Sequence, residues 1–284
     1  MLKVENLKTY LYTQQGIIKA VDDISFSISK GEKLGLVGES GSGKTMTALS
    51  IMRLVPSPPG KIINGNIIFE NKNLCTISEN EMQKIRGKDI AMIFQEPVSS
   101  LNPIFTIGDQ IAEVLRFHTN ISKEKVQDKV LELLAIVGIS SPRQRIQDYP
   151  HNLSGGMCQR VMIAMALAGN PKLLIADEPT TALDVTIQAQ ILNLLLELNK
   201  TMLLSILLIT HDLGIVAEIC DTVAIMNAGK IVEQASVQEI FNNPKHPYTI
   251  KLLEAMPRLG KKKGESSLKH VSFPNVVIGN PESF

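Results

Sequence analysis

Gly38-Glu39-Ser40-Gly41-Ser42-Gly43-Lys44-Thr45 is a complete phosphate-binding loop. It follows the apolar run 33–37, which has the character of a strand, and precedes a segment without glycine or proline, 46–54. Strand, glycine-rich loop and helix in this order give the pattern a physical mechanism. Glycines let backbone N–H groups point at phosphate oxygens, and the helix N-terminus adds the positive end of its dipole. The sequence therefore predicts a nucleotide-binding α/β domain.

Two side chains of this loop have specific expected roles. Lys44 is expected to reach the β- and γ-phosphates, and the Thr45 hydroxyl is expected to bind Mg²⁺. We also expect Lys44 to be exposed when nucleotide is absent and to contribute nothing to the core. The remaining loop residues are predicted to surround the phosphates with their backbone: Gly38, Glu39, Ser40, Gly41, Ser42 and Gly43.

Composition excludes several classes of protein. The 284 residues can form one large or two modest domains. With 29 basic and 28 acidic residues the chain has no excess charge that favours nucleic acid, which is therefore not an expected partner. No apolar run approaches the roughly 20 residues of a membrane span, and charged residues interrupt the N-terminus where a signal peptide would be apolar. Three widely spaced cysteines, Cys75, Cys158 and Cys220, indicate reduced thiols in a cytosolic protein.

Apolar patterning predicts alternating strands and helices. Helical spacing extends from about residue 105 to 170, with Gly138 as a C-cap, and again over 186–198. Asn64-Gly65 is predicted to be a tight turn between two strands. Buried strands that alternate with helices imply a parallel sheet with helices on both faces. The predicted strands are 2–5, 24–28, 62–63, 67–69, 90–94, 173–176 and 206–209.

Polar residues follow three of these strands, at the edge where an α/β sheet binds its ligands. Asp177 is positioned to hold Mg²⁺ through its water shell, and Glu178 to accept a proton from, or orient, a water that attacks the γ-phosphate. His211 could donate a hydrogen bond to the γ-phosphate, or could be a surface or capping residue. Gln95 follows the third strand.

A second glycine-rich nest, Leu153-Ser154-Gly155-Gly156-Met157-Cys158-Gln159, opens the predicted helix 157–168. One domain already has its phosphate loop, so a second nest makes sense if it completes a site on a partner subunit. With this segment the sequence resembles the ATP-binding subunits of ABC transporters over residues 2 to about 257. The matching motifs are the phosphate loop, Gln95 of the Q-loop, the signature 153–159, Asp177-Glu178 of Walker B, Ala182-Leu183-Asp184 of the D-loop and His211 of the switch.

The resemblance implies a P-loop NTPase (RecA-like) α/β core with an N-terminal antiparallel β subdomain and an inserted helical subdomain. It places the core with its β subdomain at 1–95 and 170–240, the helical signature subdomain at 96–169, and a C-terminal extension at 241–284. It further implies Mg²⁺-dependent ATP hydrolysis with these site residues: Glu178, His211 and Gln95 as catalytic residues; Thr45, Gln95 and Asp177 at the Mg²⁺; and Ser154, Gly155, Gly156 and Asp184 on the partner's ATP.

Further segments look like the subgroup of peptide and nickel importers, and within it like the D-type ATPase of oligopeptide and dipeptide permeases. The resemblance implies peptide uptake at the cytoplasmic face of the cell membrane, with nickel or metallophore import as the alternative. Its implied partners are an F-type ATPase or a second copy, two membrane-spanning permease subunits and, indirectly, an extracytoplasmic binding protein. Soluble ATPase clamps of DNA repair or translation carry tandem heads or a coiled-coil insertion, which are missing here. The segments are 95–97, 100–103, 149–151, 177–186, 246–249 and 257–259.

Three positions depart from the family pattern. The aromatic residue that stacks on adenine should fall at Leu11; Tyr12 or Tyr10 could substitute, with Tyr12 favoured, or both could be ordinary strand residues. Cys158 replaces a basic or polar residue of the signature. We expect the helix N-terminus to lower its pKa at the dimer seam, unless its side chain points into the helical subdomain. The resemblance to D-type subunits would allow a C-terminal cysteine cluster that holds an iron–sulfur centre. No cysteine follows Cys220 in this sequence, so no iron–sulfur cluster is expected.

Overall fold

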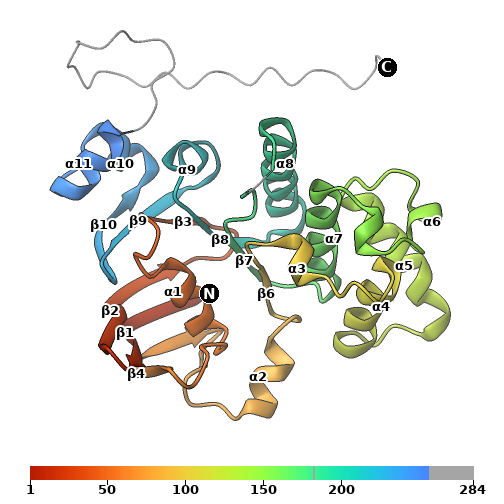
Figure 1. The fold of residues 1–284 in the computed structure, drawn as a ribbon, viewed down its shortest axis with the longest axis horizontal. Helices are drawn as coiled ribbons and strands as arrows, with labels where there is room; N and C mark the ends of the chain where they lie inside the picture. The colour runs from red at the N-terminus through yellow and green to blue at the C-terminus, as the bar shows by residue number, and fades with distance from the viewer. Residues whose placement is uncertain (182, 256–284) are drawn as a thin grey trace, which may run out of the picture.

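The computed structural model describes residues 1–181 and 183–255 as two sheets flanked by helices (Figure 1). Ala182 of the predicted D-loop, the segment 257–259 and most of the predicted 241–284 extension lie outside these residues. In the described part of the chain, no helix combines the length and apolar character that a membrane crossing requires. The smaller sheet is antiparallel, with strand order β2-β1-β4-β5. Its strands are β1 (Leu2–Thr13), β2 (Gly16–Ile28), β4 (Gly60–Phe69) and β5 (Lys72–Asn73).

The predicted turn at Asn64-Gly65 is wrong, because β4 runs without interruption through both residues. Gly65 has φ +107° and lies where the pairing of β4 with β1 shifts register between Glu5 and Lys8. A Cβ at Gly65 would lie 2.6 Å from the Leu7 Cα. The positive φ that favours Asn-Gly in hairpins also suits a β-bulge, and here it serves the bulge.

The larger sheet has six strands in the order β10-β9-β3-β8-β7-β6. All are parallel except β10, which pairs antiparallel with β9. The patterning correctly predicted β3, β6, β7 and β8, whose residues are almost all buried. It missed β9 and β10: β10 is a partly exposed edge strand without a clear period. The strands are β3 (Lys33–Val37), β6 (Ile90–Ile93), β7 (Leu173–Asp177), β8 (Ser205–Thr210), β9 (Thr222–Asn227) and β10 (Lys230–Ser236).

Both faces of this sheet are buried, as successive residues of β7 show. Leu174 and Ala176 belong to the core shared with most of the helices, whereas Leu173 and Ile175 belong to a second core. That second core contains α1, α2 and the antiparallel sheet, so the expectation of helices on both faces holds with a sheet added to one of them. The helices are α1 (Lys44–Ile51), α2 (Glu79–Ile85), α3 (Pro97–Ser100), α4 (Ile107–His118), α5 (Lys123–Ile136), α6 (Pro142–Arg145), α7 (Gly155–Ala168), α8 (Val185–Met202), α9 (Leu213–Ile219), α10 (Val237–Asn242) and α11 (Pro247–Glu254), with a short 3₁₀ turn at Pro150–Asn152.

Helices α3 to α7 are inserted in the sequence between β6 and β7, two strands that pair with each other. They form the yellow-to-green group on one side of Figure 1. The predicted C-cap of α5 is confirmed: Gly138 has φ +74° and its N–H donates to the Ala135 carbonyl at 2.9 Å. A left-handed residue is where a helix ends most easily, and glycine adopts it without a Cβ penalty.

Cys158 does not have the environment that its place near the start of α7 suggested. Its side chain is 1% exposed and packs in the core, where its thiol donates to the Pro150 carbonyl at 3.5 Å. Burial raises the pKa of the Cys158 thiol. The expectation of a lowered pKa at an accessible seam was therefore wrong: the side chain faces into the helical layer, and desolvation of a thiolate dominates over the helix terminus.

We therefore predict that Cys158 resists alkylation in the native protein. Maleimide labelling followed by mass spectrometry should modify Cys75, which is half-buried, ahead of the buried Cys158 and Cys220. Protein unfolded in urea provides the control, in which all three thiols should react. Full modification of Cys158 under native conditions would show that its placement is wrong.

Candidate functional site

The phosphate loop joins β3 to α1 and is held close to two other strands. Gly43 has φ +107° at the N-cap of α1, and a Cβ there would lie 2.1 Å from the Ala20 carbonyl oxygen of β2. Only glycine fits this combination of left-handed backbone and close approach. A residue with a side chain at position 43 would therefore push the loop away from β2.

Lys44 is not exposed, contrary to the expectation from sequence. It is 4% exposed, and its Nζ donates to the carbonyl oxygens of Gly38 at 2.8 Å and Glu39 at 2.9 Å. Burial lowers the pKa of Lys44, and the nearby carboxylates of Glu178 and Asp177 counteract part of that effect. The ammonium thus occupies the loop that phosphates would fill, and satisfies loop carbonyls in their absence.

Thr45 and Asp177 meet beside the loop. The Thr45 hydroxyl donates to Asp177 Oδ1 at 3.2 Å, and Asp177 is 2% exposed at the end of β7. Burial raises the pKa of Asp177, and the hydrogen bond from Thr45 offsets only part of it. A buried carboxylate that faces a hydroxyl is a suitable oxygen donor set for Mg²⁺. The third predicted ligand, Gln95, lines the same depression but bonds to Glu178 in this structure.

Glu178 is the centre of a hydrogen-bonded cluster. Its Oε2 accepts from Gln95 Nε2 at 3.0 Å and from the Thr181 hydroxyl at 2.9 Å, while Oε1 lies 3.2 Å from His211 Nδ1. Burial alone would raise the pKa of Glu178, but the hydrogen bonds from His211 and Thr181 lower it below its ordinary value. Its φ of +45° is strained for a residue with a Cβ. The structure thus brings the three predicted catalytic residues together around an ionised carboxylate.

These groups open onto one depression of about 930 Å³. Its polar lining contains the phosphate loop with Gln95, Glu178 and His211. Its apolar lining includes Leu11 and Ile18 from the antiparallel sheet and Leu252 from α11. If the loop held a triphosphate, these apolar side chains would be available to the nucleoside.

Leu11, and not Tyr12, lines this depression. Side chains alternate across a strand, so Tyr12 of β1 lies on the opposite face from Leu11. The Tyr10 hydroxyl donates to Asp22 at 2.6 Å, and Tyr12 is 48% exposed. Tyr12, which the sequence favoured as the adenine contact, therefore does not line this depression, whereas the aliphatic Leu11 does.

The second glycine nest lies apart from the depression of its own chain. Ser154 is the N-cap of α7 and accepts from the Met157 N–H at 3.3 Å, and Asp184 is the N-cap of α8 and accepts from the Ile187 N–H at 3.0 Å. A Cβ at Gly156 would lie 2.6 Å from Ile187 Cγ2, which places the two helix starts against each other. Neither N-cap residue, nor Gly155 or Gly156, lines the depression.

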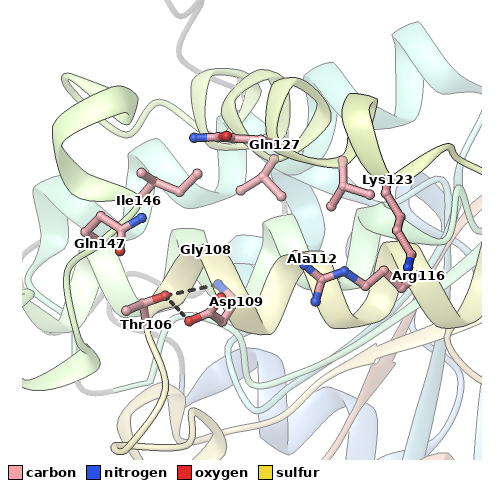
Figure 2. A pocket seen from close by; sticks show the side chains of 11 residues that line it. Thr106, Gly108, Asp109, Ala112, Arg116, Lys123, Gln127, Ile146 and Gln147 are labelled. Carbon is pink, nitrogen blue, oxygen red and sulfur yellow. Dashed lines mark hydrogen bonds between the residues drawn. The ribbon is translucent and has the colours of Figure 1, made fainter.

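A second, polar hollow of about 280 Å³ lies in the helical part, among α4, α5 and the segment after α6 (Figure 2). The Thr106 hydroxyl caps α4 there, accepting from the Asp109 N–H at 3.1 Å and donating to Asp109 Oδ2 at 2.8 Å. Arg116 and Lys123 lie at its other end (Figure 2). It shares no residue with the depression at the phosphate loop.

Among the residues of the site that sequence reasoning missed are Ile18, Thr181, Tyr248 and Leu252. Thr181 and Tyr248 stand in motifs that were recognised, but nothing in those motifs showed that their hydroxyls contact Glu178 and the phosphate loop. Ile18 and Leu252 come from distant parts of the chain, and only the folded arrangement brings them to the depression.

Replacing Lys44 by Ala is expected to abolish ATP binding and also to destabilise the nucleotide-free protein. Two loop carbonyls lose a charge-assisted donor, and relief of the desolvated ammonium offsets part of that loss, so we expect a net cost of about 1 kcal/mol. Calorimetric ATP titration and thermal unfolding measure the two effects. Lys200→Ala, at an exposed position of α8, is the control, and an unchanged nucleotide-free stability of Lys44→Ala would contradict the observed contacts.

Leu11→Ala is expected to weaken ATP binding about fivefold, since it removes about 1 kcal/mol of apolar contact with the base. Tyr12→Ala removes a larger side chain one residue away but on the other face of β1, and should bind ATP like the wild type. Titration with Mg-ATP distinguishes the two positions. A larger loss for Tyr12→Ala than for Leu11→Ala would restore Tyr12 as the base contact.

Comparison with known proteins agrees with this geometry. The ABC transporter family profile matches residues 21–181, and a profile for the C-terminal region of oligopeptide/dipeptide transporters matches residues 232–276. The oligopeptide transport ATP-binding protein OppD of Bacillus subtilis (strain 168) is 53% identical over 281 residues, covering 99% of this chain and 78% of OppD. The dipeptide transport ATP-binding protein DppD of the same organism is 51% identical over 259 residues, covering 91% of this chain and 77% of DppD.

Solved structures show the same fold. A dimeric bacterial ABC transporter cassette matches with a TM-score of 0.75 and 29% identity, over 84% of this chain and 99% of its own. A dimeric post-hydrolysis state of an ATP-binding cassette with ADP and phosphate matches with the same TM-score and 28% identity, over 84% and 99% of the two chains. By its phosphate loop, its Glu178 cluster and these matches, the chain belongs to the ABC transporter family and is an ATP-binding cassette with ATPase activity.

Proposed function

We propose that this chain hydrolyses ATP to energise the uptake of di- and oligopeptides by an ABC importer. The observation that carries the proposal is the ionised Glu178 carboxylate at the mouth of a preformed phosphate loop, in a chain whose relatives are named for oligopeptide and dipeptide transport. The match of residues 232–276 to the C-terminal region of peptide transporters supports the peptide over nickel or a metallophore.

In the proposed reaction, Lys44 leaves the carbonyls of Gly38 and Glu39 and binds the β- and γ-phosphates. Thr45 and Asp177, with Gln95, would hold Mg²⁺, which when bound offsets negative charge on the phosphates. Burial raises the pKa of Asp177, and a bound cation would favour its ionised form. Loop N–H groups and the α1 N-terminus complete the phosphate contacts.

Glu178 then orients the attacking water and accepts its proton. The hydrogen bonds from Thr181 and His211 keep Glu178 ionised, which is the form that can accept a proton. His211 is 64% exposed at its side chain and can turn toward a γ-phosphate without disturbing the core. General-base catalysis of this kind typically contributes about 10²–10⁴-fold in rate.

The second nest supports a role in trans. Ser154, Gly155, Gly156 and Asp184 do not line their own depression, and we propose that they close over ATP held by an opposing ATPase subunit, either F-type or a second copy. Two ATP molecules would join the subunits head to tail, an arrangement in keeping with the dimeric cassettes of similar fold.

The proposed location is the cytoplasmic face of the cell membrane, on two permease subunits that receive peptide from an extracytoplasmic binding protein. Gln95 lies where the chain leaves the core for helices α3 to α7, so contact of those helices with a permease would couple membrane conformation to nucleotide state. We assign the core to 1–95 and 170–240, this helical part to 96–169 and the extension to 241–284, and propose no iron–sulfur cluster or nucleic-acid partner.

Glu178→Gln is expected to trap an ATP-bound dimer, because glutamine keeps the size of the side chain but cannot accept the proton. Hydrolysis should fall about 10²–10⁴-fold, and size-exclusion chromatography with Mg-ATP should show the dimer. Glu197→Gln, at an exposed position of α8, makes the same chemical change outside the site. Hydrolysis near the wild-type rate in Glu178→Gln would remove Glu178 from its proposed role.

The substrate is tested separately, with the chain reconstituted in vesicles together with two permease subunits and a substrate-binding protein. ATP-dependent uptake of a labelled oligopeptide supports the proposal. Uptake of Ni²⁺ without uptake of peptide would contradict peptide transport and favour nickel import.

A further inference from the structure

Helix α11, near the C-terminal end of the described chain, reaches the phosphate loop. The Tyr248 hydroxyl accepts a hydrogen bond from the Glu39 N–H at 3.3 Å. One turn further along α11, Leu252 lines the depression at the same loop. Two residues of one helix, spaced i and i+4, therefore contact the candidate ATP site from a segment about 200 residues away in sequence.

The position of α11 is fixed by specific contacts. His246 is its N-cap, and Nδ1 accepts from the Tyr248 N–H at 3.1 Å. Glu233 of β10 accepts from the N–H groups of Lys245 at 2.8 Å and His246 at 3.0 Å. Burial alone would raise the pKa of Glu233, but hydrogen bonds including these two lower it, so an ionised carboxylate anchors the start of the helix.

Apolar packing holds the same helix against the core. Leu253 is 9% exposed within the core cluster, and Tyr248 and Leu252 pack against that cluster. Thr249 is fully buried beside them. With one face packed and its start anchored to β10, α11 can hold the Tyr248 hydroxyl at a defined place over the loop.

Lys44 and Tyr248 bind the same turn of the phosphate loop, Lys44 at its carbonyl oxygens and Tyr248 at an N–H group. Lys44 donates to the Gly38 and Glu39 carbonyls, whereas Tyr248 accepts from the Glu39 N–H. When phosphates draw Lys44 away, the carbonyls lose their donor, but the bond from Glu39 to Tyr248 can persist. The hydroxyl would then keep the turn in its phosphate-binding shape.

We propose that α11 is part of the nucleotide site, with Tyr248 as a positioning residue for the phosphate loop and Leu252 as one apolar wall. The inference deepens the proposed function and rests on ATP binding at this loop. It also gives a role to the motif His246-Pro247-Tyr248-Thr249, which lies in the region matched by the peptide-transporter C-terminal profile. His246 caps, Pro247 begins the helix, Tyr248 holds the loop and Thr249 packs.

The test is Tyr248→Phe in the full-length chain, which removes the hydroxyl and keeps the ring that packs on the core. One neutral, partly exposed hydrogen bond predicts a Kd and a KM for Mg-ATP about two- to fivefold higher. We expect kcat and the nucleotide-free Tm to stay at wild-type values, because the contact acts on binding alone. Tyr149→Phe makes the same change at an exposed position in the helical part and should bind ATP normally.

Leu252→Ala provides a second, independent variant, and should raise the Kd for Mg-ATP with little change in kcat. The inference is overturned if Tyr248→Phe binds ATP like the wild type, if it lowers the nucleotide-free Tm without changing ATP affinity, or if it lowers kcat at constant KM. Lys44→Ala distinguishes a failure of the α11 inference from a failure of the assigned ATP site. If Lys44→Ala still binds ATP, the assigned site is wrong; if Lys44→Ala loses ATP binding while Tyr248→Phe and Leu252→Ala both bind like the wild type, the site stands and α11 has no part in it.

Discussion

Burial of both faces of the six-stranded sheet is the constraint on which the site depends. Residues of β7 and β8 contact a core on either side, so charged side chains can be accommodated only where the strands end. In a parallel sheet these ends meet at one edge. That edge collects the phosphate loop after β3, Asp177 at the end of β7, Glu178 after it, and His211 after β8. Burial of both faces requires apolar strands, and it thereby gathers the polar site residues at the ends of these strands.

Two of the charged side chains at this edge, Lys44 and Asp177, would be stabilised by a bound ligand of opposite charge. Lys44 is buried with a lowered pKa, and Asp177 is buried with a raised one, so each ion is less stable there than it would be in water. Lys44 is compensated by loop carbonyls, Asp177 by one hydroxyl, and Glu178 by three side chains. Bound phosphate would stabilise the buried Lys44 ammonium, and a bound cation would stabilise the buried Asp177 carboxylate. Glu178 already has its donors, which suits a base that must remain ionised throughout.

Sequence could predict the parts of this arrangement that depend on local spacing. The phosphate loop, the buried strands and the Walker B pair follow from composition over five to eight residues. It failed where the folded arrangement of the backbone, and not the local pattern, decides the outcome. Lys44 is buried by carbonyls of its own loop, and Cys158 faces the core although it lies near a helix start. Asn64-Gly65 forms a bulge because β1 lies opposite, and β10 shows no period because it is an exposed edge.

The lining of the depression brings together three parts of the chain that lie far apart in the sequence. Leu11 and Ile18 come from the antiparallel sheet, the loop from the central sheet, and Leu252 from the C-terminal helix. A nucleotide bound there would contact all three at once. Coupling of this kind is reciprocal: if ATP stabilises α11 against the loop, anything that displaces α11 must weaken ATP binding by the same free energy. Helix α11 is therefore placed where a partner could change ATP affinity without touching the phosphate loop.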